Sequence, residues 1–293
     1  MSSLTDATTT SPLRGRLFRA ATYLATTLVL ASTSQASETV LTADDIAPFR
    51  VTYSVGNNLV TAGNASLELN ELDGDIWQFQ LETNPTGVFK LTGKGNVSET
   101  SILRFEPAPD DGFLLRSESY SYRQDNEKRR AVDAAFNWKS KTLAWTRRGE
   151  SDTASLAEEP VLDRLSVSLA VMSALRKGET EVEFLVFDSG RLKNVIFTVS
   201  GEEQLETSLG TLDTLRVERN NAKGSSRTTV TWFAPSLDYM PVKIEQLKRG
   251  GLVARLTLKS LTYRDIKVDE PLITPEGQES AGEDAAQTEE INE

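Results

Sequence analysis

Residues 160–177 read PVLDRLSVSLAVMSALRK, and this stretch breaks the strand-like pattern found along most of the chain. Pro160 suits the first position of a helix, and Gly178 suits a C-terminal stop. Small residues such as Ala170 and Val171 extend the apolar surface almost all round, so we expect a buried helix at about 160–177. Its large apolar residues recur at helical steps of three or four: Leu162, Leu165, Leu169, Met172 and Leu175.

On both sides of this segment, apolar and polar residues alternate with period two. Trp77, Phe79 and Leu81, for example, share one parity, and the polar residues between them share the other. Such runs, separated by turn residues from position 49 to about 265, are typical of half-buried antiparallel strands. The pattern predicts roughly a dozen strands.

A sheet of that size has to curl, close or split, because exposed edges invite aggregation. We therefore expect a mainly β fold, in which a large curled antiparallel sheet or barrel surrounds one buried α-helix. The strands and the helix form a single domain over residues 48–268; two subdomains are the alternative.

The first 36 residues have the pattern of a cleavable export signal. Three arginines (Arg14, Arg16 and Arg19) precede the uncharged segment 20–31, and small residues at 34 and 36 suit cleavage near Ala36–Ser37. The uncharged segment is shorter than the roughly 20 residues that a membrane-spanning helix needs. The pattern predicts a periplasmic protein with a linker at 37–47; an uncleaved anchor is the alternative.

The composition excludes several kinds of chemistry. The 293 residues include no His and no Cys, which rules out Ser-His-Asp triads, thiol nucleophiles and His- or Cys-bound zinc. We expect no cofactor, no metal and no catalytic residue. The net charge of −11 argues against nucleic acid as a partner and favours, at most, peripheral contact with a membrane. Nine acids and no Lys or Arg fall in 269–293, which we expect to be a disordered tail, so residues 37–268 carry only −4.

Four residues are candidates for ligand binding. Asp163 and Arg164 are charged residues in an otherwise apolar segment, and a buried charge needs a partner. They either tie the helix to the surrounding strands or face a ligand. Trp232 and Tyr239 flank a predicted loop and either pack in the core or contact an apolar ligand.

Five short motifs carry a family resemblance: FRVTY at 49–53, DRLS at 163–166, LGTLDT at 209–214, WFAP at 232–235 and YMPVKI at 239–244. In combination they resemble the bacterial exported family known as domain of unknown function 3108. The resemblance spans about 48–266 and implies a β-rich envelope protein with one helix. It implies no established activity and supplies no catalytic residues to carry over.

Three functions fit these observations. The first is a non-catalytic periplasmic binding or chaperone-like module for an apolar or lipidic ligand, with a lipid, a lipoprotein or another envelope protein as its partner. The second is a structural or protein-interaction β-barrel with a filled core. The third is a carboxylate-dependent glycan hydrolase, which needs two acids facing one cleft. A filled core predicts no cavity of about 300 Å³ or more.

Overall fold

The computed structural model describes residues 40–41, 47–57, 59–87, 95–108, 112–156, 160–220, 226–263 and 266–268. All of them belong to one compact unit that starts at Ala36. The predicted signal peptide (1–36), the predicted tail (269–293) and most of the linker (37–47) lie outside the described residues.

The described residues confirm a mainly β fold with one α-helix. The first strands are β1 (Val40–Leu41), β2 (Phe49–Gly56), β3 (Thr61–Asp73), β4 (Ile76–Pro85), β5 (Val97–Pro107), β6 (Phe113–Gln124), β7 (Val132–Asn137), β8 (Thr142–Arg147), β9 (Glu150–Ser155) and β10 (Val161–Asp163). The helix is α1 (Val167–Arg176), and the strands after it are β11 (Glu181–Phe187), β12 (Leu192–Thr207), β13 (Gly210–Asn220), β14 (Arg227–Ala234), β15 (Met240–Lys248), β16 (Gly251–Tyr263) and β17 (Ile266–Val268). Short 3-10 helices occupy Lys128–Arg130 (η3) and Pro235–Leu237 (η4).

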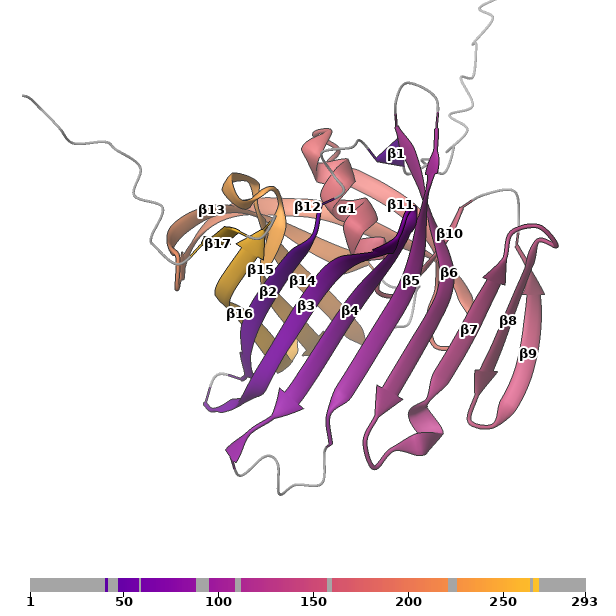
Figure 1. Cartoon of the computed structure of the whole chain (residues 1–293). Coiled ribbons are helices and arrows are strands. Elements are labelled where there is room, and N and C mark those ends of the chain that lie inside the picture. Colours follow the sequence, from indigo (N-terminus) through magenta and orange to yellow (C-terminus); the bar gives the residue numbers. More distant parts are fainter. Residues whose placement is uncertain are drawn as a thin grey trace, which may run out of the picture. The chain divides into compact units, whose positions relative to one another are not determined.

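The 17 strands of the described residues belong to one sheet, more than the dozen that the sequence predicts (Figure 1). Strands β2 to β9 pair in sequence order, and so do β10 to β16. The antiparallel pair β16–β2, with Leu258 opposite Tyr53, joins the two series. The short strands β1 and β17 pair with β6 and β16. Strands that precede and follow the helix in the chain therefore form one continuous surface.

The sheet curls until β10 lies against β6. No backbone ladder joins these two strands among the described residues; instead, the backbone N–H of Asp163 donates to Ser117 Oγ at 3.0 Å. The sheet is thus curled but not closed, and β7, β8 and β9 extend beyond this contact (Figure 1). Register shifts opposite Ser117 and within β12, β14, β15 and β16 mark bulges, which bend strands and increase their twist.

The helix is shorter than the apolar spacing predicts. It begins at Val167 rather than at Pro160, because Val161–Asp163 forms β10, which runs parallel to the end of β11. Val161 and Leu162 are fully buried, and a buried strand satisfies their apolar character as well as a helix does. No helix in the described part of the chain is long and apolar enough to span a bilayer.

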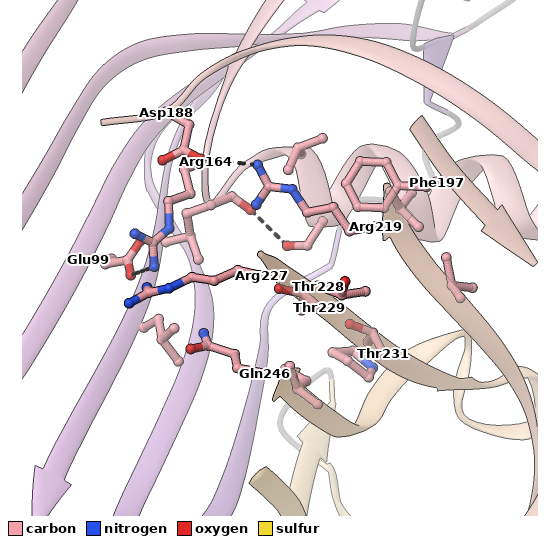
Figure 2. Close-up of a pocket in the computed structure, with 18 of the residues that line it drawn as sticks. Glu99, Arg164, Asp188, Phe197, Arg219, Arg227, Thr228, Thr229, Thr231 and Gln246 are labelled. Carbon is pink, nitrogen blue, oxygen red and sulfur yellow. Dashed lines mark hydrogen bonds and ion pairs between the residues drawn. The ribbon is translucent and has the colours of Figure 1, made fainter. Parts of the chain in front are cut away.

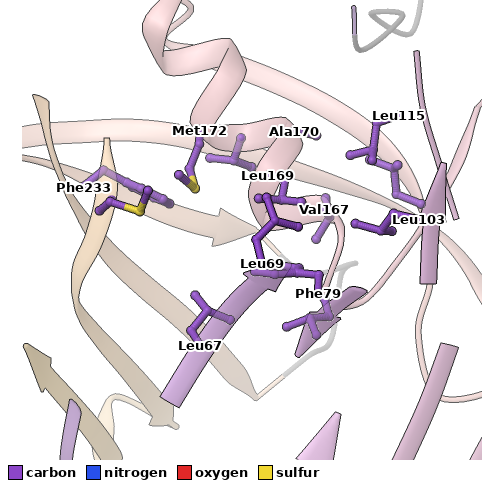
Figure 3. Packing of buried hydrophobic residues seen from close by; sticks show 14 of the residues in the cluster. Leu67, Leu69, Phe79, Leu103, Leu115, Val167, Leu169, Ala170, Met172 and Phe233 are labelled. Atoms are coloured by element: carbon purple, nitrogen blue, oxygen red, sulfur yellow. The ribbon is translucent and has the colours of Figure 1, made fainter. Parts of the chain in front are cut away.

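Helix α1 packs against strands from both halves of the sheet. Figure 3 shows Leu169 and Met172 of α1 near Leu69 of β3 and Phe233 of β14. Each of these side chains is at most 5% exposed, and burying such a side chain stabilises a fold by roughly 1.5–3 kcal/mol. At the other end of α1, the guanidinium of Arg176 donates to the carboxylate and backbone carbonyl of Asp238.

A fully buried carboxylate joins the helix to the sheet. Asp163 Oδ1 accepts hydrogen bonds from Ser101 Oγ at 2.6 Å and from the N–H groups of Leu165 and Ser166 at 2.8 and 2.9 Å. Its Oδ2 accepts one from Ser117 Oγ at 2.7 Å. Burial raises the pKa of Asp163, and these donors oppose that rise. We call this group, which connects β5, β6 and the start of α1, the Asp163 junction.

Replacing Asp163 with Ala is expected to lower the free energy of unfolding by about 3–5 kcal/mol, because four buried donors lose their acceptor. Asp163→Asn keeps the shape and one acceptor oxygen, so its loss should be smaller. Urea unfolding followed by circular dichroism measures both. Equal stability of Asp163→Ala and the natural chain would show that the junction does not hold the sheet.

Candidate functional site

A cavity of about 410 Å³ lies inside the curled sheet, beside the start of α1 (Figure 2). Strands β3, β4 and β5 from the first half of the chain and β12 to β16 from the second half line it. Its volume exceeds the roughly 300 Å³ above which an interior is large enough for a ligand. The cavity exists only because the sheet brings the two halves face to face.

Strand β14 shows how the wall is built. Thr229, Thr231 and Phe233 line the cavity at the spacing of one strand face, and Val230 and Trp232 between them do not. Thr228, near the start of the strand, also lines it. Apolar residues make up a large part of the remaining wall: Leu67, Leu81, Val167, Val171, Phe197, Val217, Ile244 and Leu247. This part of the wall therefore combines apolar side chains with threonine hydroxyl groups.

Charged side chains gather at one end of the cavity. Figure 2 shows Arg164, Arg219 and Arg227 near Glu99 and Asp188. They come from five places in the chain: the turn before α1, the end of β13, the start of β14, the first part of β5 and the loop after β11. Lys193 at the start of β12 also lines the cavity.

The first ion pair joins Glu99 and Arg164. The guanidinium Nη2 of Arg164 donates to Glu99 Oε1 at 2.8 Å, and the hydroxyl of Tyr120 donates to Glu99 Oε2 at 3.0 Å. The Glu99 side chain is only 4% exposed. The neighbouring Glu99 raises the pKa of Arg164 above its ordinary value, so Arg164 stays charged at the cavity wall.

The second group centres on Asp188. Its Oδ2 lies 3.3 Å from Arg219 Nη2 and 3.4 Å from Lys193 Nζ. Burial pushes the pKa of Asp188 upward, but Arg164, Lys193 and Arg219 outweigh it, so the pKa is lowered. Burial lowers the pKa of Arg219, and Arg164 adds to the effect. The Nε of Arg219 is buried without a hydrogen-bond partner among the described residues.

The structure places one of the four sequence-predicted ligand residues, Arg164, in the cavity wall. Asp163 lies in the junction instead. Trp232, on the far face of β14, donates from Nε1 to Glu203 at 2.9 Å and has Lys243 Nζ 3.9 Å from its ring centroid. Tyr239 follows η4 in a left-handed backbone conformation and does not line the cavity.

Sequence reasoning did not single out Arg219, Asp188, Lys193 or Arg227. One signal was available for Arg219, because it shares the parity of Val217, and the two face inward together from β13. The other three lie at strand ends or in loops, where a charged residue is ordinarily taken to be solvated. Within the described part of the chain, no three acidic side chains gather as metal ligands would.

Comparisons with known proteins identify the family of this chain. No curated protein matches the chain. One similar solved structure is a β-barrel-like protein of domain of unknown function DUF1849 from Brucella abortus. It is 12% identical, with a TM-score of 0.38, over 75% of this chain and 99% of that one. The sequence profile of the family described as "Protein of unknown function (DUF3108)" matches residues 22–257. The chain belongs to the DUF3108 family.

Proposed function

We propose that this protein is a non-catalytic periplasmic module that binds an apolar or lipidic ligand inside its curled sheet. The observation that carries the proposal is the cavity of about 410 Å³, whose wall joins apolar side chains to a group of polar and charged ones. Small-molecule sites are usually concave, of about 300–1,000 Å³, and apolar with a few placed polar groups. The described cavity is concave, its volume falls in this range, and apolar side chains form half of its lining residues.

The export signal predicted at 1–36 supports a periplasmic location for this activity. A ligand with a long apolar part is poorly soluble in an aqueous compartment, because its exposed apolar surface is costly. A protein that shields such a ligand acts as its carrier or chaperone. Its partners are then the lipid or lipoprotein that it carries and the envelope proteins that deliver or accept that cargo.

The cavity weighs against a filled structural barrel, for which we expect no internal space of ligand size. It also weakens the hydrolase alternative. Glu99 and Asp188 both line the cavity, but each is held in ion pairs with basic side chains. A glycosidase needs one carboxyl group with a raised pKa to act as acid, whereas the pKa of Asp188 is lowered.

The first test uses N-phenylnaphthylamine, an uncharged probe that fluoresces strongly in apolar surroundings. We expect saturable binding of one probe per chain, and release of the probe when a long-chain alkyl amphiphile is added below its micelle concentration. Fluorescence titration measures both. An absence of saturable binding, together with no thermal stabilisation by any alkyl amphiphile, would contradict the proposed function.

A second test fills the cavity from its wall. Thr231→Trp places a bulky ring next to Val217 and Ile244 and should weaken probe binding by about tenfold or more, because the space for the ligand is lost. Thr153→Trp is the matched control: it makes the same change on β9, where the residue is exposed.

Circular dichroism and thermal unfolding establish that both variants are folded before their affinities are compared. A folded Thr231→Trp variant that binds the probe as well as Thr153→Trp does would place the binding site elsewhere.

A further inference from the structure

The cavity has a positive charge balance. Four basic side chains (Arg164, Lys193, Arg219 and Arg227) and two acidic ones (Glu99 and Asp188) line it. The side chains of Glu99, Arg219 and Asp188 are at most 17% exposed, and buried charges are costly unless they are matched, because they lose their hydration. Even without the exposed Arg227, the three remaining basic side chains outnumber the two acidic ones.

Arg219 shows this imbalance most directly. Its side chain is 15% exposed and shares the carboxylate of Asp188 with Lys193. The Nε–H group of Arg219 has no acceptor in the described part of the chain. A buried donor without an acceptor is destabilising, and a guanidinium is well shaped to bind a carboxylate or phosphate through two N–H groups. Because Arg219 lines the cavity and shares Asp188 with Lys193, an anion bound there would give its guanidinium a second acceptor.

The charged end and the apolar end are ordered along the strands. Arg227 at the start of β14 is exposed, whereas Phe233 near its end is 3% exposed. On the neighbouring strand, Arg219 pairs with Thr229 and Val217 pairs with Thr231. A ligand lying along β14 therefore meets cations near the solvent and apolar side chains further in. This order matches a molecule with an anionic head and an apolar tail.

We propose that the cavity selects amphiphiles with an anionic head group, a carboxylate or a phosphate, which Arg219 binds beside Arg164 while the alkyl chain lies along Val217 and Phe233. This inference rests on the proposed function, since it specifies the ligand of the same cavity. It adds a requirement for negative charge that an apolar cavity alone does not impose.

Four dodecyl compounds with identical tails test this requirement: dodecanoate, dodecyl phosphate, dodecanol and dodecyltrimethylammonium. Each competes with bound N-phenylnaphthylamine on the full chain, below its micelle concentration. We expect dodecanoate, dodecyl phosphate or both to bind at least about tenfold more tightly than dodecanol, as one charge-assisted hydrogen bond allows. The cation should bind most weakly. The two anions distinguish a carboxylate head from a phosphate head.

Arg219→Met removes the cation but keeps a long side chain, and Arg219→Lys restores the charge. The ratio of the anion's affinity to that of dodecanol should fall about tenfold in Arg219→Met and recover in part in Arg219→Lys. Arg216→Met is the matched control, since Arg216 lies on the same strand, outside the cavity wall, and pairs with Glu203 and Glu218.

The possible results separate the two proposals. Equal affinity for anionic and neutral heads in the natural chain overturns the head-group inference and leaves the proposed function standing. So does an unchanged ratio in a folded Arg219→Met variant. Failure of every dodecyl compound and of the probe to bind overturns both. The head-group series on the natural chain decides the inference even where a variant does not fold.

Discussion

The buried carboxylate of Asp163 is the contact on which the curl of the sheet and the position of the cavity both depend. It accepts hydrogen bonds from β5, from β6 and from the turn into α1, at a place where β10 and β6 share no backbone ladder among the described residues. Side-chain hydrogen bonds thus hold β10 against β6, where a closed barrel would have a backbone ladder between the two strands. Because Arg164 follows directly, the same turn brings a guanidinium to Glu99 at the cavity wall.

Much of the fold follows from local pattern. The alternation of Trp77, Phe79 and Leu81 predicts β4 correctly, because side chains on opposite sides of a strand meet different surroundings. The start of the helix could not be predicted in this way. Val161 and Leu162 continue the helical spacing but form β10. That outcome depends on a ladder with β11 and on the hydrogen bonds that Ser101 and Ser117 donate to Asp163. Those partners are distant in sequence and leave no local signal.

The candidate site was harder to predict than the fold. A charge in an apolar segment singled out Arg164, and the structure places that residue at the cavity wall. Trp232 was a candidate for ligand contact because it is an aromatic residue near a predicted loop. Its ring instead packs beside Lys243 and Arg216 on the far face of β14. Arg219 is a candidate because it pairs with Asp188 and because its Nε is buried. Both features depend on the tertiary structure.

The cavity wall differs in net charge from the folded domain as a whole. Residues 37–268 carry a net charge of −4, whereas the cavity wall carries more basic than acidic side chains. The most direct measurement is a crystal structure of the chain grown with dodecanoate. Electron density for one carboxylate beside Arg219, with the alkyl chain running toward Phe233, is the result expected for a hollow sheet that binds an anionic amphiphile. A cavity filled by protein side chains, or a dodecanoate bound elsewhere on the protein, would contradict it.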